Sequence, residues 1–105
     1  MRERTLLEFE THVLVDGGIR AFISQTQGFI DALFVDPPFQ SRGLGKQLLD
    51  HAKAQTRLLR LSVFAQNPRA VRFYQREGFW ATQVTEHRET AETIVLLKWE
   101  AKNDV

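Results

Sequence analysis

Apolar stretches of this chain are separated by glycine and proline breaks, and the breaks predict where elements begin and end. His12–Asp16 and Ile19–Ser24 flank Gly17-Gly18, where adjacent glycines supply the positive φ of a tight turn. These segments predict a β-hairpin. Phe29–Val35 predicts a further strand, which ends at Asp36-Pro37-Pro38 because proline lacks a ladder donor and restricts the preceding residue.

Two helices are predicted in the rest of the chain. From Leu44 to Gln55 the apolar residues recur at helical spacing, which indicates a helix that packs through one face. Asn67-Pro68 predicts the N-cap and first position of a second helix to Glu77, with Gly78 at C′. The remaining predicted elements are the strands Leu58–Phe64, Phe79–Thr85 and Thr93–Trp99, with residues 86–92 as a polar connection.

Composition narrows the class of protein. The 105 residues are 43% hydrophobic, which suits one compact domain, so we predict a single domain over residues 1–105. Fourteen Lys and Arg against 13 Asp and Glu give a net charge of +1, so no nucleic-acid partner is expected. The absence of cysteine excludes disulfides and a thiol nucleophile and favours the cytoplasm. No segment is long enough to cross a bilayer, so no membrane partner is expected.

The stretch FQSRGLGKQLLDHA, residues 39–52, joins a predicted strand to a predicted helix through Gly43 and Gly45. If the strands on either side of that helix are parallel neighbours, the connection is a right-handed βαβ crossover. The first-turn N–H groups of a helix have no internal partners and carry the positive end of its dipole. Glycine lets the backbone approach a ligand, so the junction favours an anion, above all a phosphate.

Two familiar phosphate motifs do not match this junction. A P-loop ending at Gly45-Lys46 requires glycine in place of Gln40 and a hydroxyl residue in place of Gln47. A dinucleotide fingerprint starting at Gly43 requires a small residue in place of Leu48 and an acid after the next strand. Neither motif explains the junction.

Gln40, Gly43 and Gly45 fill the pattern of Arg or Gln, two residues, Gly, any residue, then Gly or Ala. Together with the upstream LFVDP and the downstream NPRAVRFYQREGF, at residues 33–37 and 67–79, this stretch resembles the GNAT family of N-acetyltransferases. The resemblance covers residues 12–99 and is greatest to small bacterial protein or small-molecule acetyltransferases. It implies an α/β (α+β), GNAT-like acyl-CoA N-acyltransferase fold: a mixed, mostly antiparallel sheet with a central βαβ unit and two main helices.

The resemblance also implies acetyl-CoA as co-substrate and a set of site residues. The backbone of Leu33, Phe34 and Val35 would pair with the pantetheine arm and orient the acetyl carbonyl. Asn67 would hydrogen-bond the pantetheine, and Tyr74 would protonate the leaving thiolate. Gln40, the first residue of the motif, would belong to the coenzyme site. The pyrophosphate would be held by backbone N–H groups at Ser41, Arg42, Gly43, Leu44, Gly45 and Lys46, with Arg42 and Lys46 adding charge.

The base that deprotonates the acceptor amine is less clearly marked. Asp31 lies on the predicted coenzyme strand, where a carboxylate serves as base in some relatives, and it is equally consistent with a solvated strand residue. Glu77, Glu86 and His87 are weaker candidates. No metal is expected, because His12, His51 and His87 are scattered and lack acidic partners at ligand spacing.

The main departure from the family pattern lies at the N-terminus. A complete member carries a first strand and two helices before the hairpin, and the helices form one wall of the acceptor groove. Here about ten residues precede His12, so we expect an N-terminally truncated fold without that strand and those helices, in which Thr5–Glu10 extends the strand that follows. A missing layer would expose apolar surface, so we expect a homo-oligomer, a dimer, to cover it.

Two functions of different classes follow. The favoured one is an N-acetyltransferase in which a primary amine, on a small molecule or a protein lysine or N-terminus, attacks acetyl-CoA directly, because no cysteine is present to carry the acetyl group. The alternative is a non-catalytic CoA-binding or interaction module that has lost its acceptor wall. An assay of thiol release distinguishes the two, whereas coenzyme titration does not.

Overall fold

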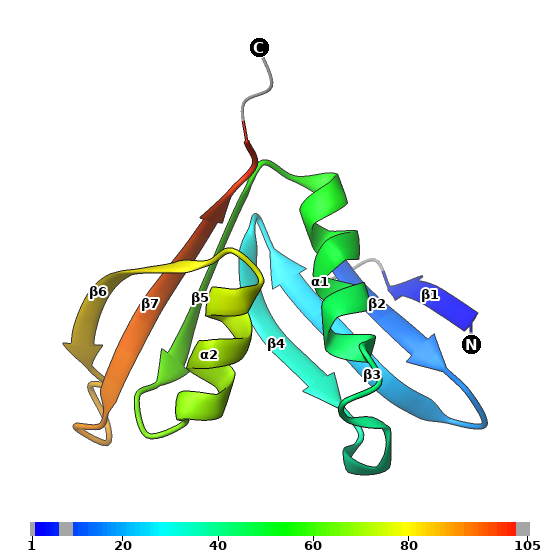
Figure 1. Ribbon diagram of the computed structural model, residues 1–105, viewed down its shortest axis with the longest axis horizontal. Helices are drawn as coiled ribbons and strands as arrows, with labels where there is room; N and C mark the ends of the chain where they lie inside the picture. The colour runs from blue at the N-terminus through cyan, green and yellow to red at the C-terminus, as the bar shows by residue number, and fades with distance from the viewer. Residues whose placement is uncertain (1, 7–9, 103–105) are drawn as a thin grey trace. The chain divides into compact units, whose positions relative to one another are not determined.

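The computed structural model describes residues 2–6 and 10–102, with residues 2–6 and 10 described through their backbone alone. The chain forms two compact units, Met1–Arg57 and Leu58–Val105. Each unit is built from strands and one α-helix (Figure 1). The prediction of a single domain is not tested by this division and stays a prediction, as does the βαβ crossover, which spans the boundary.

The first unit is a four-stranded antiparallel meander of β1 (Arg2–Leu6), β2 (Glu10–Val15), β3 (Ile19–Thr26) and β4 (Phe29–Val35). The β2–β3 turn has positive φ at Gly17 and Gly18, as the hairpin prediction required. A short 3-10 helix, η1 (Pro37–Phe39), follows β4, and α1 spans Leu44–Gln55.

One face of this sheet is covered by α1 (Figure 1). The helix buries Leu44, Leu48, Leu49 and Ala52, in agreement with the predicted helical spacing. The ring of His51 on α1 contacts the ring of His12, which pairs in register with Ile23. The face that carries His12 and Ile23 therefore lies under α1. Phe22 and Phe34 pair across β3 and β4 on the opposite face, with ring centroids 5.6 Å apart.

The second unit contains β5 (Leu58–Phe64), α2 (Pro68–Arg76), β6 (Trp80–Glu86) and β7 (Thr93–Glu100). Both β5 and β6 pair antiparallel with β7, so β7 is the central strand of the three. Helix α2 ends one residue earlier than predicted, with Glu77 as C-cap and Gly78 at φ +94°. The buried Phe79 packs its ring against Tyr74 instead of starting β6.

The N-terminal prediction was wrong in one respect. A separate strand, β1, precedes the hairpin and pairs along β2 from Arg2↔Val15 to Leu6↔Thr11. Thr5 and Leu6 belong to this strand and do not extend β2, and residues 7–9 lie outside the described residues. The physical reason is that pairing with β1 satisfies the backbone groups along the outer edge of β2, which a longer β2 would leave to solvent. No helix precedes β2 within the described residues.

Candidate functional site

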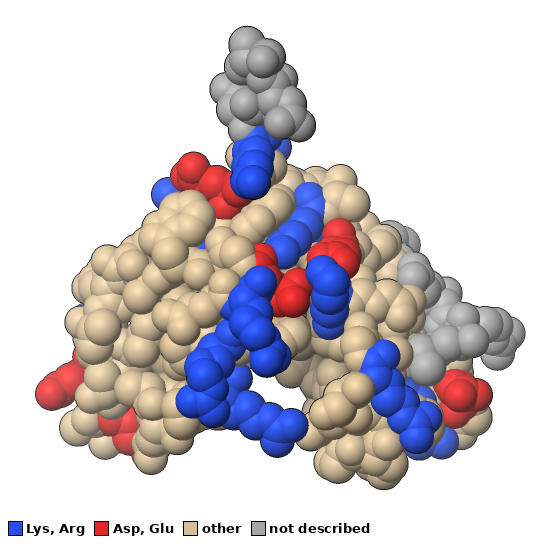
Figure 2. All heavy atoms as spheres, in the orientation of Figure 1, with Lys and Arg blue, Asp and Glu red and all other residues tan. Residues whose placement is uncertain are grey.

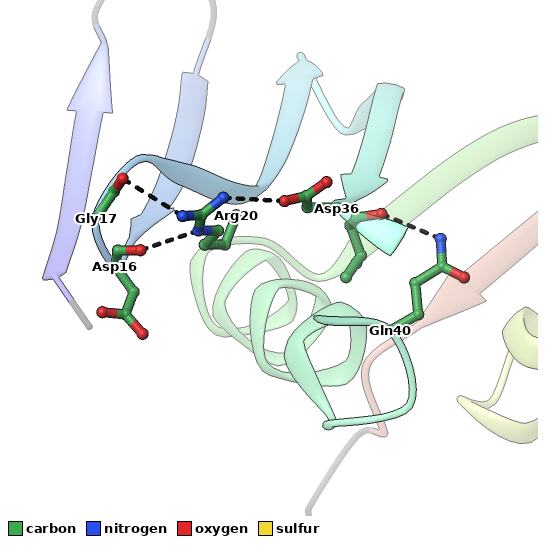
Figure 3. A network of polar contacts seen from close by, with 6 residues as sticks. Asp16, Gly17, Arg20, Asp36 and Gln40 are labelled. Carbon is green, nitrogen blue, oxygen red and sulfur yellow. Dashed lines mark hydrogen bonds and ion pairs between the residues drawn. The ribbon is translucent and has the colours of Figure 1, made fainter. Parts of the chain in front are cut away.

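The segment from the end of β4 to the start of α1 has an ordered set of hydrogen bonds. After Val35, η1 closes with the Phe39 N–H donating to the Asp36 carbonyl at 2.7 Å. The side-chain amide of Gln40 then turns back, and its Nε2 donates to the Val35 carbonyl oxygen at 3.1 Å (Figure 3). Gln40, the first residue of the predicted motif, therefore fixes the loop to the end of the strand that it leaves.

The backbone of the loop then enters the left-handed region twice. Ser41 has φ +66° and Gly43 has φ +79°, on either side of Arg42. Successive N–H groups in backbone of alternating hand form concavities that bind anions. A Cβ built on Gly43 would meet no atom within 4 Å, so the space above this residue is open. Glycine at position 43 is explained by its positive φ, and the open space allows a ligand to approach its backbone.

Gly43 is also the N-cap of α1. The Gln47 N–H donates to the Gly43 carbonyl at 2.9 Å, the first bond of the helical ladder, and no side chain caps the first turn. The first turn contains no acidic residue either. Leu44 points into the core, with 7% of its surface exposed, so it anchors the helix start and presents only its backbone to the loop. The first turn of α1 thus has the features of an anion-binding helix start.

The positive side chains near this turn are Arg42 and Lys46. The Arg42 guanidinium lies over the ring of Phe39, 4.9 Å from its centroid. Lys46 Nζ forms an ion pair with Asp50 at 3.2 Å, one turn further along α1. Blue and red side chains follow one another over α1 in Figure 2. Among the ion pairs of the described residues, Lys46 is paired with Asp50 and none involves Arg42, so Arg42 retains its full positive charge in the loop.

The strand β4 contains an irregularity at Asp31. Ser24 pairs with Ala32 and Gln25 pairs with Ile30, so Asp31 is the extra residue on β4. Its carboxylate is exposed and accepts a hydrogen bond from the Thr26 hydroxyl at 2.7 Å. The bulge turns Asp31 out of the ladder, a device that proteins use to re-aim a side chain near active sites. Asp31 is accessible, and its role as a base stays a prediction.

In the second unit, the predicted N-cap of α2 is confirmed. The Asn67 side-chain oxygen accepts a hydrogen bond from the Ala70 N–H at 3.2 Å, and Pro68 occupies the first helical position. The acceptor end of the Asn67 amide is therefore used inside the protein, while its NH₂ group has two donors. A cap and a ligand contact by the same side chain are chemically compatible.

Tyr74 is the one tyrosine of the chain and is largely buried on α2, with 8% of its surface exposed. Its ring makes edge contacts with Phe73 and Phe79, at centroid distances of 5.1 and 5.4 Å. Burial raises the pKa of the Tyr74 phenol from 10.0 to about 12, because the phenolate would lose its hydration. Tyr74 therefore stays protonated at neutral pH, as a general acid must.

The predicted site residues divide between the two units. Asp31, Leu33, Phe34, Val35 and the residues from Gln40 to Lys46 lie in the first, and Asn67 and Tyr74 lie in the second. Within the first unit the structure brings the end of β4, Gln40 and the glycine turn together. The assignment of all these residues to one site stays a prediction.

Sequence reasoning missed the contact between two histidines. His12 and His51 belong to β2 and α1, and their ring centroids lie 3.3 Å apart, so they are not scattered in space. No signal of this histidine contact is present in the sequence, because the contact depends on how α1 packs on the sheet.

In the described part of the chain, no three His, Asp or Glu side chains form a cluster suited to a metal ion. None of the described helices is both long and apolar enough to span a membrane.

Comparison with known proteins identifies the family. The family model for the acetyltransferase (GNAT) domain matches residues 4–81. This chain belongs to the GNAT acetyltransferase family. Among curated GNAT relatives, peptidyl-lysine N-acetyltransferase YiaC from Escherichia coli is 33% identical over 85 residues, which cover 80% of this chain and 58% of YiaC. The chain spans about half the length of the curated relatives that it matches, between 46% and 58% for the first three.

Solved GNAT structures share the fold. The solution structure of apo-form YjaB from Escherichia coli matches with a TM-score of 0.78 at 28% identity, covering 90% of this chain and 67% of that one. A GNAT family acetyltransferase from Elizabethkingia anophelis, solved with acetyl-CoA bound, matches with a TM-score of 0.74 at 18% identity, covering 88% of this chain and 76% of that one. These matches confirm the predicted GNAT-like fold.

Proposed function

We propose that this chain is an N-acetyltransferase that transfers the acetyl group of acetyl-CoA to a primary amine by direct attack. The observation that carries the proposal is the start of α1. A glycine N-cap with positive φ, open space above it and no side-chain cap leaves first-turn N–H groups for the coenzyme pyrophosphate. Membership of the GNAT family and a fold neighbour solved with acetyl-CoA bound support the choice of ligand.

Each residue then has a defined task. The backbone of Leu33, Phe34 and Val35 pairs with the pantetheine arm as an added strand, and a backbone N–H there stabilises the oxyanion that forms on the acetyl carbonyl. Asn67 donates its amide N–H to the pantetheine while its oxygen caps α2. The pyrophosphate binds to backbone N–H groups at Ser41, Arg42, Gly43, Leu44, Gly45 and Lys46, while Gln40 holds this loop against the end of β4.

Proton transfer completes the reaction. The acceptor amine loses a proton, and its nitrogen forms the new bond to the acetyl carbon while the carbon–sulfur bond breaks. Tyr74 donates its phenolic proton to the leaving thiolate, because its raised pKa keeps the phenol protonated. Asp31, exposed at the bulge of β4, is the candidate to take the proton of the amine, directly or through water.

For the acceptor, we propose a lysine side chain of a protein. Support comes from YiaC, a peptidyl-lysine N-acetyltransferase that is 33% identical over 85 residues. The test is release of free CoA from acetyl-CoA in the presence of lysine peptides, polyamines, amino acids or aminoglycosides. Turnover with lysine peptides above the other amines is the expected result. Binding of acetyl-CoA without turnover on any amine would instead favour the non-catalytic CoA-binding module.

We also propose a cytoplasmic homodimer. The support is the face of the β1–β4 sheet away from α1, where Phe34 stacks on Phe22 and keeps 41% of its surface exposed. A chain without cysteine suits a reducing compartment. Analytical ultracentrifugation tests the dimer, and a stable monomer at micromolar concentration would contradict it.

A further inference from the structure

Arg20, a residue outside the GNAT motif, contacts both the start and the middle of the β4–α1 loop. It lies at the start of β3, two residues after the Gly17-Gly18 turn, and 29% of its side chain is exposed. Its guanidinium Nη1 donates to Asp36 Oδ2 at 3.1 Å (Figure 3). Its Nε donates to the Asp16 carbonyl at 2.9 Å and its Nη2 to the Gly17 carbonyl at 3.4 Å. One side chain thus joins the hairpin turn to the exit of β4.

The backbone reinforces this connection. The Asp36 N–H donates to the Arg20 carbonyl at 2.7 Å, so the two residues are linked through main chain and side chain together. Asp36 also begins the loop, because it is the N-cap of η1 and its carbonyl accepts the Phe39 N–H. The direction in which the chain leaves β4 is therefore set by its contacts with Arg20.

The same guanidinium reaches the middle of the loop. It lies 4.8 Å from the ring centroid of Phe39, and the Arg42 guanidinium lies 4.9 Å from that centroid. Phe39 is thus a shared aromatic surface for two cations. A change at Arg20 that moves Phe39 also moves Arg42, the charged side chain next to Gly43.

The positive charge of Arg20 also offsets a negative charge that would weaken anion binding at the loop. Asp36 is the one acidic residue between positions 32 and 49. Its ion pair with Arg20 offsets a negative charge close to the segment that would hold a pyrophosphate. Without Arg20, that carboxylate would repel the ligand.

We propose that Arg20 is a positioning residue for coenzyme binding: it holds the Asp36–Phe39 turn in place, orients Arg42 through Phe39, and neutralises Asp36. This inference rests on the proposed function, because it assigns the loop to the pyrophosphate of acetyl-CoA. Arg20 acts through Asp36, Phe39 and Arg42, since three of its N–H groups already donate within the protein.

The test compares two ligands in calorimetric titrations of Arg20→Ala and wild type. Acetyl-CoA carries the pyrophosphate, and acetyl-pantetheine carries the same thioester arm without it. Arg20→Ala is expected to weaken acetyl-CoA binding about tenfold, the equivalent of one charge-assisted hydrogen bond, and to leave acetyl-pantetheine binding unchanged. The matched control is Arg57→Ala, which removes an exposed arginine of the same unit outside the loop and is expected to change neither affinity.

Two further variants separate position from charge. Arg20→Lys retains a positive charge near Asp36 but loses the planar fork and its stacking on Phe39, so it should recover only part of the affinity. The double variant with Arg20→Ala and Asp36→Asn removes the repulsion between the Asp36 carboxylate and the pyrophosphate. It should likewise recover only part of the acetyl-CoA affinity. Full recovery by the double variant would reduce the role of Arg20 to neutralising Asp36 and overturn the positioning role.

The remaining outcomes are also decisive. If wild type binds acetyl-CoA and Arg20→Ala binds it equally well, the proposal is wrong. If both ligands weaken equally, Arg20 has a general structural role and the proposal is again wrong. If Arg20→Ala does not fold, Arg20→Lys is titrated with both ligands instead. A loss of affinity for acetyl-CoA alone would then support the proposal, and an equal loss or no loss would contradict it. If wild type itself binds no acetyl-CoA, the proposed function fails, whereas the other outcomes leave that function intact.

Discussion

The two α-helices of this chain begin in opposite ways. At α2 the chain supplies its own cap: Asn67 accepts from the Ala70 N–H, and Pro68 removes one N–H that would need a partner. At α1 the N-cap is Gly43, which has no side chain to accept a hydrogen bond, and the space above it is open. The side-chain cap of α2 gives a first-turn N–H group a partner within the protein. At α1 no side chain does so, and the first-turn N–H groups are left to donate to a bound anion as their partner.

This difference assigns the two helices different contributions to function. On the proposed function, α1 binds the coenzyme through backbone groups, and α2 contributes the side chains of Asn67 and Tyr74. Because α1 is proposed to bind the ligand through its backbone, a glycine at its N-cap leaves room for that ligand. Because α2 is proposed to act through side chains, its first turn can be capped by Asn67 without loss of function. The following experiments test that division, beginning with the largest expected effect.

Replacing Gly43 with valine should have the largest effect on ligand affinity. Its φ of +79° costs an L-residue about 1–2 kcal/mol of stability, and the new side chain fills the open space. Loss of two charge-assisted hydrogen bonds, about 1.5–3 kcal/mol each, corresponds to a hundredfold or greater loss of acetyl-CoA affinity. Calorimetric titration of wild type and Gly43→Val with acetyl-CoA measures this loss of affinity.

Gly78→Ala is the matched control for that experiment. Gly78 follows α2 at φ +94°, and a Cβ there would lie 3.4 Å from the Trp99 ring, so this variant is destabilised by a similar backbone cost. We expect acetyl-CoA affinity to stay unchanged in Gly78→Ala. Equal losses of affinity in the two variants would show that stability, and not the open start of α1, governs binding.

Tyr74→Phe tests the side-chain contribution of α2. The change removes only the hydroxyl, so the contacts with Phe73 and Phe79 persist. Loss of a general acid should lower kcat about a hundredfold or more while acetyl-CoA affinity stays within a factor of about two. Steady-state kinetics and titration on one preparation separate the two quantities. Unchanged kcat would remove Tyr74 from the mechanism.

The raised pKa of Tyr74 also predicts an alkaline loss of stability. Below pH 10 the phenol is protonated in both the folded and the unfolded chain, so it contributes no pH dependence. As pH rises from 10 to about 12, the unfolded chain ionises first and binds fewer protons, so the free energy of unfolding falls by about 2–3 kcal/mol. Chemical denaturation at pH 9 and 11.5 should show this fall in wild type and a smaller one in Tyr74→Phe.

Since Tyr74 is the one tyrosine, its ultraviolet absorbance reports its ionisation directly. A tyrosinate midpoint near 10 in the folded protein would contradict the buried, protonated phenol.

Asn67 offers the finest test of the comparison, because its cap and its ligand contact use different atoms. Asn67→Ala removes both and should cost about 1 kcal/mol of stability. Asn67→Asp retains an oxygen that accepts from the Ala70 N–H but loses the amide donor, so stability should be kept and acetyl-CoA affinity lowered a few-fold. Thermal unfolding and titration measure the two effects. Wild-type affinity in Asn67→Asp would limit Asn67 to its role as a cap.

Local sequence signals predicted much of the fold. The bounds of β4, Phe29–Val35, and of α1, Leu44–Gln55, agree with the prediction because a glycine or proline break stands beside each element. The N-cap role of Asn67 was likewise readable, since a cap involves only residues three apart. Element bounds and helix caps can be predicted because they depend on residues only a few positions apart in the sequence.

Other features depend on pairing between distant residues, and sequence alone did not reveal them. Strand β1 was missed because its partner, β2, lies beyond a segment with no clear turn signal. Arg20 and Asp36 are 16 positions apart, and only the β3–β4 register places their side chains together. The motif contains the residues that are proposed to bind the coenzyme, whereas Arg20, which is proposed to orient Arg42, lies outside it.

The bulge also means that β4 contains one residue that its pairing with β3 does not use. Because Asp31 is an extra residue, Ile30 and Leu33 are three positions apart, although an unbroken strand returns to the same face every two positions. Deleting Asp31 would restore an uninterrupted ladder with Ala32 opposite Ser24 and Ile30 opposite Gln25, so Ile30 and Leu33 would stay on the same face. Deleting Phe34 instead would move the residues on one side of it to the other face of the sheet, so the loss of Asp31 should destabilise the fold less than the loss of Phe34.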